Sequence, residues 1–350
     1  MVEFRIASKS DNLGLLELTS SVSMEGNISL RIDRNPDFFK ILELRGKSLV
    51  IIAEENQKII GAVCASLQNC YIDGKLYPVQ YVGDFKVLKS YRNKGVGMKL
   101  LSVLAAKLYE LDFDLVFFNF SKGNKKPVSF SKNKSEYTNF ENIGLFTVYQ
   151  FIGKQFKWSN PDYTIEVSEI SEELIAFIGA KYQRYDLRTP ITNIQLEGTS
   201  IYTICYKGTL IGAMSIIDTM PIKQNVVIKV SWKLNLMLKL LNVVNPIFGF
   251  SKMPTLNQPV KMIYIKYLAI NLSEKKALKL LIDHARNIAY NKSYSFVSIG
   301  CHEKDPLQQH FSKILKFTFN SIGMLTSLKN NQNLIDKVKS GIPYEDFSLV

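Results

Sequence analysis

The sequence predicts an α/β protein with a mixed sheet, built as two similar halves in tandem. Extended apolar runs alternate with helical patterns along the chain, and this order typically builds a mixed α/β sheet. The same order of elements occurs twice. With 350 residues, 46% of them apolar, the chain is also long enough for two domains, each with its own core.

The elements of the two halves correspond one to one. The first half predicts a strand at residues 4–6, a helix at 13–21, a hairpin of strands 49–53 and 59–67, a strand at 81–88, a helix at 98–109 and a strand at 115–120. The second half predicts the same series at 163–167, 172–182, 201–206 with 210–217, 264–272, 273–290 and 295–300. Both hairpins contain Ile-Gly-Ala, at 60–62 and 211–213. We therefore expect two domains, 1–155 and 156–350, joined near 154–162.

The junction between residues 81–88 and the following helix carries the clearest functional signal. An extended run ends at Val87, and a basic loop with Arg92, Lys94, Gly95 and Gly97 leads directly into the helix. Glycines allow the backbone to approach a ligand closely, and a helix N-terminus offers N–H groups and partial positive charge. This arrangement predicts a pyrophosphate site.

The spacing in this loop distinguishes it from two other phosphate loops. It fits neither G-x-x-x-x-G-K-[ST] nor G-x-G-x-x-G. It reads R-x-x-G-x-G after a strand, and this resembles the coenzyme A loop of the GNAT superfamily of N-acetyltransferases. The match lies at Val87, Arg92, Gly95 and Gly97, whereas Lys89 replaces the usual proline. The alternative is a basic turn between a strand and a helix.

The resemblance implies where acetyl-CoA, the expected co-substrate, is bound. The strand backbone is expected to pair with the pantetheine arm, with an N–H near Val87 or Leu88 facing the thioester oxygen, and residues 92–97 to hold the phosphates. The implied cofactor contacts are Phe85, Val87, Leu88, Lys89, Arg92, Asn93, Lys94, Gly95, Val96, Gly97, Met98 and, after the strand at 115–120, Asn124.

Two residues are the candidates for catalysis. Asp84 lies in an apolar strand, where desolvation would raise its pKa and suit it as the general base; the alternatives are a water chain as the base, or a structural ion pair for Asp84. The superfamily's usual acid is a tyrosine, but Phe140 stands at the corresponding position in residues 139–145. Tyr137, three residues earlier, reaches the same face of a helix and is the candidate acid.

The second half differs from the first at the corresponding loop and in an insertion. No glycine lies between Ile270 and Leu280, so we expect one acyl-CoA site per chain, in the first half. The insertion at 231–254 includes a helical pattern at 232–244 that is apolar nearly all round. Three roles are open for it: a mostly buried helix, a wall for an apolar acceptor, or a helix at a membrane interface.

Composition limits the remaining possibilities. The net charge of +13 (44 basic minus 31 acidic residues) fits anionic ligands such as coenzyme A, and no nucleic-acid-binding motif accompanies it. The four cysteines show no CxxC pair, and no apolar run is long enough to span a membrane. We expect a cytoplasmic protein without a metal.

These expectations combine into an N-acetyltransferase acting on an amine by direct attack. Two alternatives are kept. One is an acyl-CoA-binding protein without catalysis, since Phe140 cannot donate a proton. The other is an N-acyltransferase that uses a longer acyl chain, with the 231–254 insertion as part of an apolar channel. Neither the acceptor amine nor the oligomeric state follows from the sequence.

Overall fold

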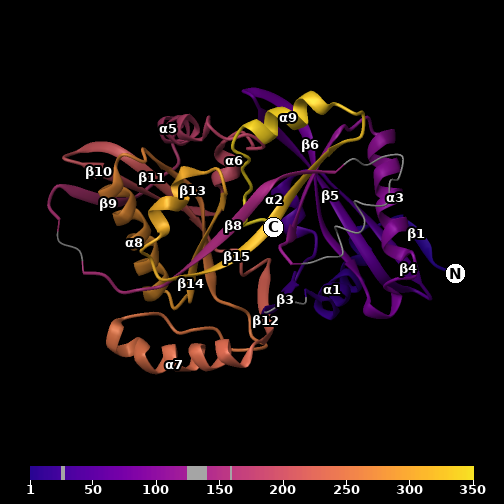
Figure 1. The fold of residues 1–350 in the computed structure, drawn as a ribbon, viewed down its shortest axis with the longest axis horizontal. Coiled ribbons are helices and arrows are strands. Elements are labelled where there is room, and N and C mark those ends of the chain that lie inside the picture. Colours follow the sequence, from indigo (N-terminus) through magenta and orange to yellow (C-terminus); the bar gives the residue numbers. More distant parts are fainter. Residues whose placement is uncertain (25–27, 124–139, 158–159) are drawn as a thin grey trace.

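The structure, a computed structural model, describes residues 1–24, 28–123, 140–157 and 160–350 and contains one long mixed sheet covered by helices (Figure 1). The strand order in this sheet is β1-β4-β5-β6-β7-β15-β8-β14-β13-β11-β10-β9. Strands β12, β3 and β2 form a smaller sheet. In the described ranges, no helix has the length and apolar character needed to cross a bilayer. The predicted mixed α/β fold is confirmed.

The elements of the first half follow the predicted series. They are β1 (Glu3–Ile6), α1 (Asn12–Ser21), β2 (Ser23–Met24), β3 (Ile28–Asp33), α2 (Lys40–Arg45), β4 (Ser48–Glu55), β5 (Lys58–Ile72), β6 (Lys75–Val87), α3 (Val96–Glu110), β7 (Leu115–Ser121) and β8 (Glu141–Ile152). The small strands β2 and β3 and the long strand β8 were not expected from the sequence.

The elements of the second half repeat that series with an insertion. They are β9 (Tyr163–Ser168), α5 (Glu172–Tyr182), α6 (Asn193–Leu196), β10 (Thr199–Tyr206), β11 (Thr209–Ile217), β12 (Gln224–Val230), α7 (Trp232–Phe248), β13 (Met262–Ile270), α8 (Lys275–Asn291), β14 (Phe296–His302), β15 (Lys316–Ser327) and α9 (Gln332–Ser340). Helix α7 continues through Asn245 and Pro246, where the sequence predicts its end.

Strands β8 and β15 exchange places between the two halves of the sheet. β15, near the end of the chain, pairs with β7 on one side and with β8 on the other. β8, from the first half, pairs with β14 of the second. Each half of the sheet therefore takes its last strand from the other half of the chain. The division into domains 1–155 and 156–350 stays a prediction. If it holds, each domain contributes one strand, β8 or β15, to the other domain's part of the sheet.

Two parallel strand pairs diverge and leave wedge-shaped openings. β6 pairs with β7 only from Val79 to Tyr81, although β6 continues to Val87. β13 pairs with β14 only from Met262 to Tyr264, although β13 continues to Ile270. We call the opening between β6 and β7 the first wedge and that between β13 and β14 the second wedge. Along the unpaired part of each wedge, the strand backbone can bond to something other than its neighbouring strand.

Each wedge is followed by a helix that packs on the sheet through one face. Helix α3 buries Val96, Leu100, Leu104 and Leu108, which recur at every fourth position, against β4 and β5. Helix α8 packs in the same way in the second half and begins at Lys275, two residues later than the sequence predicts. The position of α3 fixes its N-terminus beside the end of β6.

Candidate acyl-CoA site

The glycine loop joins the end of β6 to the N-terminus of α3. A short 3-10 turn at Lys89–Tyr91 follows β6. Gly95 is the N-cap of α3 and has a left-handed backbone, with φ of +80°. The next three residues form the first turn of α3, where N–H groups have no acceptor within the helix. These groups and the positive end of the helix dipole are available to an anion.

The two glycines of the loop meet different requirements. At Gly95 the positive φ is strained for other residues, and a Cβ there would contact no atom within 4 Å. At Gly97 a Cβ would lie 3.1 Å from Cζ of Phe85, so a side chain would crowd the end of β6. Arg92 donates from Nε to the carbonyl oxygen of Val87 at 3.1 Å, which holds the loop against β6.

The backbone of Val87 faces the first wedge. The N–H of Leu88 donates to the oxygen of Ile60 in β5 at 2.8 Å, and Val87 lies opposite Gly61. Hydrogen-bonded and non-bonded pairs alternate along an antiparallel ladder, so the N–H of Val87 points away from β5 and toward the wedge. Since the Leu88 N–H is used within the sheet, Val87 is the one of the two candidates whose N–H is oriented toward a ligand there.

A cavity of about 870 Å³ extends from the first wedge into the second half of the molecule. Phe85, Met98 and Leu101 line it next to the glycine loop. Its other end is lined by Tyr264, Phe296 and, from the inner side of α7, Leu234 and Leu238. Most of the lining is apolar. Pockets for small-molecule ligands span ~300–1,000 Å³, so this cavity can hold an extended apolar group.

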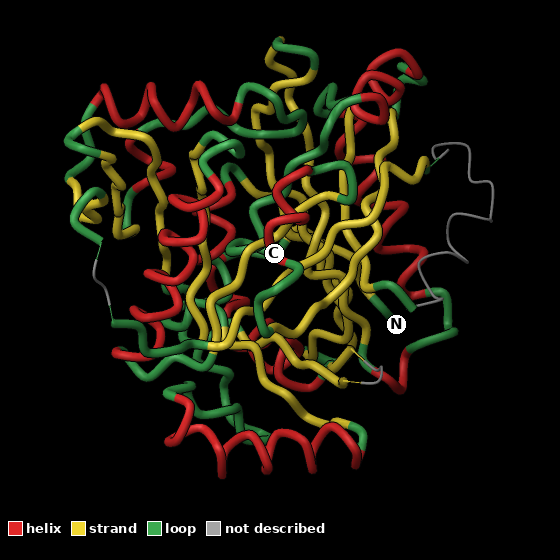
Figure 2. The backbone as a smooth tube through the Cα atoms, turned by 60° about the vertical axis from the view of Figure 1, so that its left-hand side comes forward, coloured by secondary structure: helices red, strands yellow, loops and turns green. Residues whose placement is uncertain are grey.

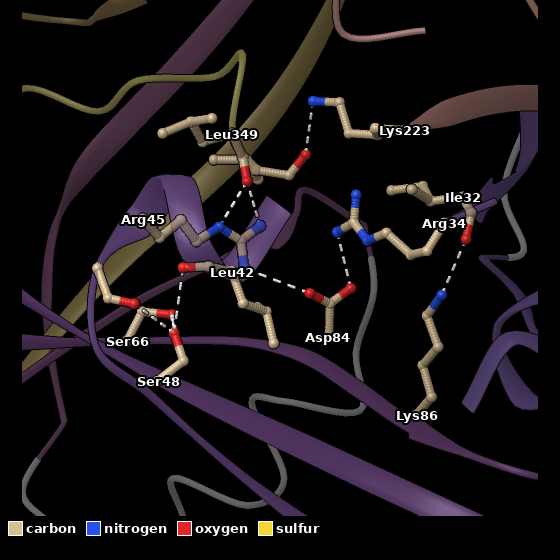
Figure 3. Close-up of polar contacts among 12 residues, drawn as sticks. Ile32, Arg34, Leu42, Arg45, Ser48, Ser66, Asp84, Lys86, Lys223 and Leu349 are labelled. Atoms are coloured by element: carbon tan, nitrogen blue, oxygen red, sulfur yellow. Dashed lines mark hydrogen bonds and ion pairs between the residues drawn. The ribbon is translucent and has the colours of Figure 1, made fainter. Parts of the chain in front are cut away.

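A charged cluster lines the cavity where the two halves meet, and Figure 3 shows its members. Asp84 lies at a β-bulge in β6 and has a φ of +49°. Its carboxylate accepts hydrogen bonds from Arg34 at 2.8 Å and from Arg45 at 3.3 Å. The three side chains are almost fully buried, with 2–4% of their surface exposed. Asp84 is therefore a partner in a buried ion-pair network.

The expected rise in the pKa of Asp84 is wrong. Burial alone raises the pKa of this carboxyl, but the charges of Arg34, Arg45 and Lys86 outweigh burial and hold the pKa well below its usual range. Both arginines lie at least 39 residues from Asp84 in the sequence, in the segment after β3 and at the end of α2. Their approach depends on the tertiary fold. A carboxylate with a lowered pKa is a weak base.

Three buried cations were not identified as site residues from the sequence, and two of them, Arg34 and Lys86, line the cavity. Arg34 is 2% exposed, and its Nε and Nη1 have no hydrogen-bond partner among the described residues. Lys86 donates to the oxygen of Ile32 at 3.1 Å, and burial lowers the pKa of Lys86 to about 8. Burial likewise lowers the pKa of Lys223 well below its usual value. No local motif marks these residues, because they lie far apart in the sequence: after β3, in β6 and before β12.

The segment 347–350 lies in the middle of the molecule (Figures 1 and 2). Arg45, from the first half, donates from Nε to the oxygen of Leu349 at 2.6 Å. Lys223, from the second half, donates to the oxygens of Phe347, Ser348 and Val350 at 2.7–3.2 Å. One buried cation from each half thus fixes this segment beside Asp84.

Two predicted site residues, Asn124 and Tyr137, lie outside the described residues. Phe140 is described, and its ring packs edge-on against Phe118 with 5.2 Å between centroids. The sequence predicts Tyr137 and Phe140 on one face of a helix; Phe140 lies in no helix, and β8 begins at the next residue, Glu141. The described residues contain no group of three or more His, Cys, Asp or Glu side chains placed to hold a metal ion.

Comparisons with known proteins agree with this geometry. The family model described as the acetyltransferase (GNAT) family matches residues 18–132. No curated protein sequence matches the chain. Among solved structures, a tandem GNAT protein from the clavulanic acid biosynthesis pathway is similar with a TM-score of 0.58 and 11% identity, covering 94% of this chain and 99% of that chain.

Two further structures are similar in fold. N-myristoyltransferase from Saccharomyces cerevisiae with bound myristoyl-CoA has a TM-score of 0.58 and 12% identity, covering 93% of this chain and 82% of that chain. A GCN5-related N-acetyltransferase from Anabaena variabilis has a TM-score of 0.54 and 11% identity, covering 94% of this chain and 73% of that chain. The chain therefore carries a domain of the acetyltransferase (GNAT) family at residues 18–132, within a fold of the tandem GNAT kind.

Proposed function

We propose that the protein transfers an acyl group from acyl-CoA to an amine, which attacks the thioester directly. One observation carries the proposal: the glycine loop joins two segments that line the cavity, the end of β6 at residues 82–86 and the first turn of α3 at Met98, and β6 runs beyond its pairing with β7 there. The loop suits a pyrophosphate, and the strand edge suits an extended pantetheine arm that pairs with it. The cavity lies where the acyl group would then be directed.

The size of the cavity favours a long acyl chain. The acetyl group expected from the sequence needs only a small part of 870 Å³. The apolar lining continues from Met98 to Phe296, which suits a chain entering from the thioester end. The yeast N-myristoyltransferase of similar fold was solved with myristoyl-CoA, a long-chain donor. We therefore favour the long-chain alternative over acetyl transfer.

A second candidate keeps acetyl-CoA as the donor and places an apolar acceptor in the cavity. The part of the cavity below α7, lined by Leu234 and Leu238, lies in the second half of the chain, away from the loop. An acceptor with an apolar body could enter there and present its amine at the thioester. In this case affinity for acyl-CoA would not rise with chain length.

The chemistry follows from the orientation of these groups. The acceptor nitrogen bonds to the thioester carbon, the C–S bond breaks, and the Val87 N–H stabilises the negative charge that develops on oxygen. The thiolate is a good leaving group because a thiol has a pKa of about 8.5, so a weak acid or water suffices; Tyr137 stays the candidate acid. Since Asp84 remains ion-paired, we propose that water accepts the amine proton while Asp84 positions Arg34.

Arg34 gives the acceptor end of the site a further property. Its Nε and Nη1 are buried at the cavity wall and are not hydrogen-bonded to any described residue. Burying such donors without a partner is costly, so we propose that the acceptor brings an anionic group, a carboxylate or a phosphate, that accepts from them.

The test is release of free thiol from acyl-CoA in the presence of a panel of amines. Gly95→Ala should lower this activity at least roughly tenfold, because alanine is strained at a positive φ and the loop must change shape. Gly208→Ala is the matched control: its φ of +82° is nearly the same, its surroundings are also open, and it lies in the hairpin turn between β10 and β11. Thiol release no faster than background with every amine would instead favour the binding protein without catalysis.

A further inference from the structure

Helix α7 has an apolar outer face that no other described element covers. Seven large apolar side chains of the helix are exposed, by 41–79%. They are Trp232, Leu236, Met237, Leu240, Val243, Ile247 and Phe248. The expectation of a mostly buried helix is therefore wrong. Figures 1 and 2 both show α7 along the lower margin of the molecule, with only its inner side toward the sheet.

Five of the seven exposed side chains form a continuous stripe. Residues 232, 236, 240, 243 and 247 lie within ~80° of arc at ~100° per residue, so they share one side of the helix. By the same geometry, Lys233 and Lys239 fall on the two borders of this stripe. Lysine side chains in such positions can extend to a polar layer while their stems stay beside apolar groups.

The charged residues in the sequence segment that contains α7 are all of one sign. Residues 219–273 contain seven lysines and no aspartate or glutamate. Five of these lysines are exposed, and four lie on α7 or within four residues of it: Lys229, Lys233, Lys239 and Lys252. A protein partner of average composition gives no reason for such a bias, whereas an anionic surface does.

The inner side of the same helix lines the cavity. Leu234 and Leu238 contribute to the cavity wall, and Asn242 Oδ1 accepts from the N–H of Met253 at 2.7 Å, which ties the helix to the segment after it. Helix α7 thus separates the cavity from the region outside. An apolar molecule lying in a membrane beneath α7 would be one helix away from the acyl path.

We propose that α7 docks the protein onto an anionic lipid membrane, with the stripe in the interfacial region and the flanking lysines at the lipid phosphates. Trp, Leu and Phe on one face with lysine at its borders is the composition that interfacial helices use. The proposal goes beyond acyl transfer and does not depend on it, because it concerns only the outer face of α7. Its test therefore needs neither acyl-CoA nor an acceptor.

The first experiment is cosedimentation with vesicles of phosphatidylcholine alone and of phosphatidylcholine mixed with phosphatidylglycerol. The full chain should bind the mixed vesicles and bind them less at high salt. Replacing Val243→Gln and Ile247→Gln together should weaken binding by roughly tenfold or more. The matched control is Val167→Gln with Ile194→Gln: these residues are 73% and 76% exposed, against 73% and 79% for the test pair, and lie in β9 and α6.

The lysines provide an independent second variant. Lys233→Gln with Lys239→Gln should lower affinity for the mixed vesicles by roughly thirtyfold, at ~1 kcal/mol for each lysine near an anionic surface. Both substitutions are on an exposed helix face, so the fold is expected to be kept, and circular dichroism verifies this. The proposal would be overturned if Val167→Gln with Ile194→Gln lost as much vesicle affinity as the α7 variants. It would also be overturned if binding were the same with and without phosphatidylglycerol.

Fluorescence can show whether α7 enters the lipid interface. The chain has two tryptophans, Trp158 and Trp232, so Trp158→Phe leaves Trp232 as the single reporter. Its emission should shift to the blue with mixed vesicles and stay unchanged in buffer. If light scattering instead shows a dimer in buffer that Val243→Gln with Ile247→Gln converts to a monomer, the stripe is an interface between copies and the membrane proposal is wrong.

Discussion

The first and second wedges have the same strand topology, but the first opens into a large cavity and the second is filled by side chains. In each, a parallel pair separates after three residue pairs, and the longer strand continues toward a helix N-terminus. The first wedge opens into a cavity of about 870 Å³, whereas the corresponding cavity beside the second wedge is about 20 Å³, room for about one water molecule.

Tyrosine side chains fill the second wedge. The hydroxyl of Tyr182 accepts from the N–H of Leu268 at 2.9 Å, and that of Tyr344 donates to the oxygen of Lys266 at 2.7 Å, so the free edge of β13 is bonded from within the protein. The rings of Tyr182, Tyr185, Tyr267 and Tyr344 pack with 5.1–5.5 Å between centroids. On the corresponding edge of β6, the side chain of Arg92 bonds the oxygen of Val87 at the end of the strand, and the N–H of Val87 stays directed toward the opening.

If the first wedge is the acyl-CoA site that we propose, the difference means that the fold alone does not make such a site. Under the proposed function, a wedge can serve as a site when its strand extends beyond its pairing with the neighbouring strand, when the loop beyond it contains glycines, and when space lies beneath it. The second half lacks all three: the interval before α8 has no glycine, the edge of β13 is bonded to tyrosine side chains, and the space beneath it is filled. This is the structural reason to expect one site per chain.

The largest expected effect concerns the ion pair at the bulge of the first wedge. Asp84→Asn leaves Arg34 and Arg45 buried without their charged partner and should lower the unfolding free energy by ~3–5 kcal/mol. Because the pKa of Asp84 is lowered in the folded protein, its contribution is full above pH ~4 and is lost as the pH falls further. Denaturant titration at several pH values measures both the loss of unfolding free energy and its pH dependence.

The control for this variant is Asp73→Asn. Asp73 also forms an ion pair, with Lys337 at 2.8 Å, but both side chains are solvent-exposed, so stability should hardly change. If Asp84→Asn is as stable as Asp73→Asn, the network does not organise the first wedge.

The next effect tests whether the cavity holds the acyl chain. Ala105 of α3 lines the cavity, and Ala105→Trp should exclude several methylenes of a long acyl group. At ~0.8 kcal/mol for each buried CH₂, four excluded methylenes cost about 3 kcal/mol, roughly a hundredfold in affinity. Affinity for acetyl-CoA should be unchanged. The neighbouring Ala106 faces solvent, so Ala106→Trp is the matched control and should change neither affinity.

A smaller effect should appear in the pH dependence of stability. The pKa of Lys86 falls to about 8 in the folded protein, so between pH 8 and about 10.5 the unfolded chain binds more protons and stability rises with pH. Relative to Lys86→Met, the wild type should gain ~2 kcal/mol across this window. Equal slopes for the two proteins would mean that Lys86 is solvated normally and that the first wedge does not desolvate it.

The smallest effect belongs to the second wedge. Tyr344→Phe removes the hydrogen bond to Lys266 and should lower the unfolding free energy by about 1 kcal/mol. Acyl-CoA affinity should not change. A clear loss of affinity in this variant would mean that the second wedge takes part in binding and that the two wedges are less different than their contents indicate.

The parts of this fold that depend on local sequence could be predicted. Gly95 and Gly97 mark the loop because their spacing is a local sequence pattern, and apolar periodicity identified α3, α5 and α8. The Arg34–Asp84–Arg45 cluster could not be predicted, since its members meet only through tertiary packing. The exchange of β8 and β15 was missed for the same reason: strand partners are set by contacts far apart in sequence.

Helix α7 shows that an apolar helical pattern does not by itself predict burial. A helix that is apolar nearly all round normally indicates burial, and the pattern for residues 232–244 was consistent with that. The structure uses only one side of the helix for packing and leaves Val243 and Ile247 exposed. The lack of acidic residues from 219 to 273 was the available signal, and it is visible only when charge is counted over the whole insertion.

The most direct test of the account is calorimetric titration of the protein with acyl-CoA of increasing chain length. We predict one binding site per chain and an affinity that rises with each added pair of methylenes until the cavity is full. Two sites per chain, or no binding of any acyl-CoA, would contradict the claim that only the first wedge is open to the cofactor.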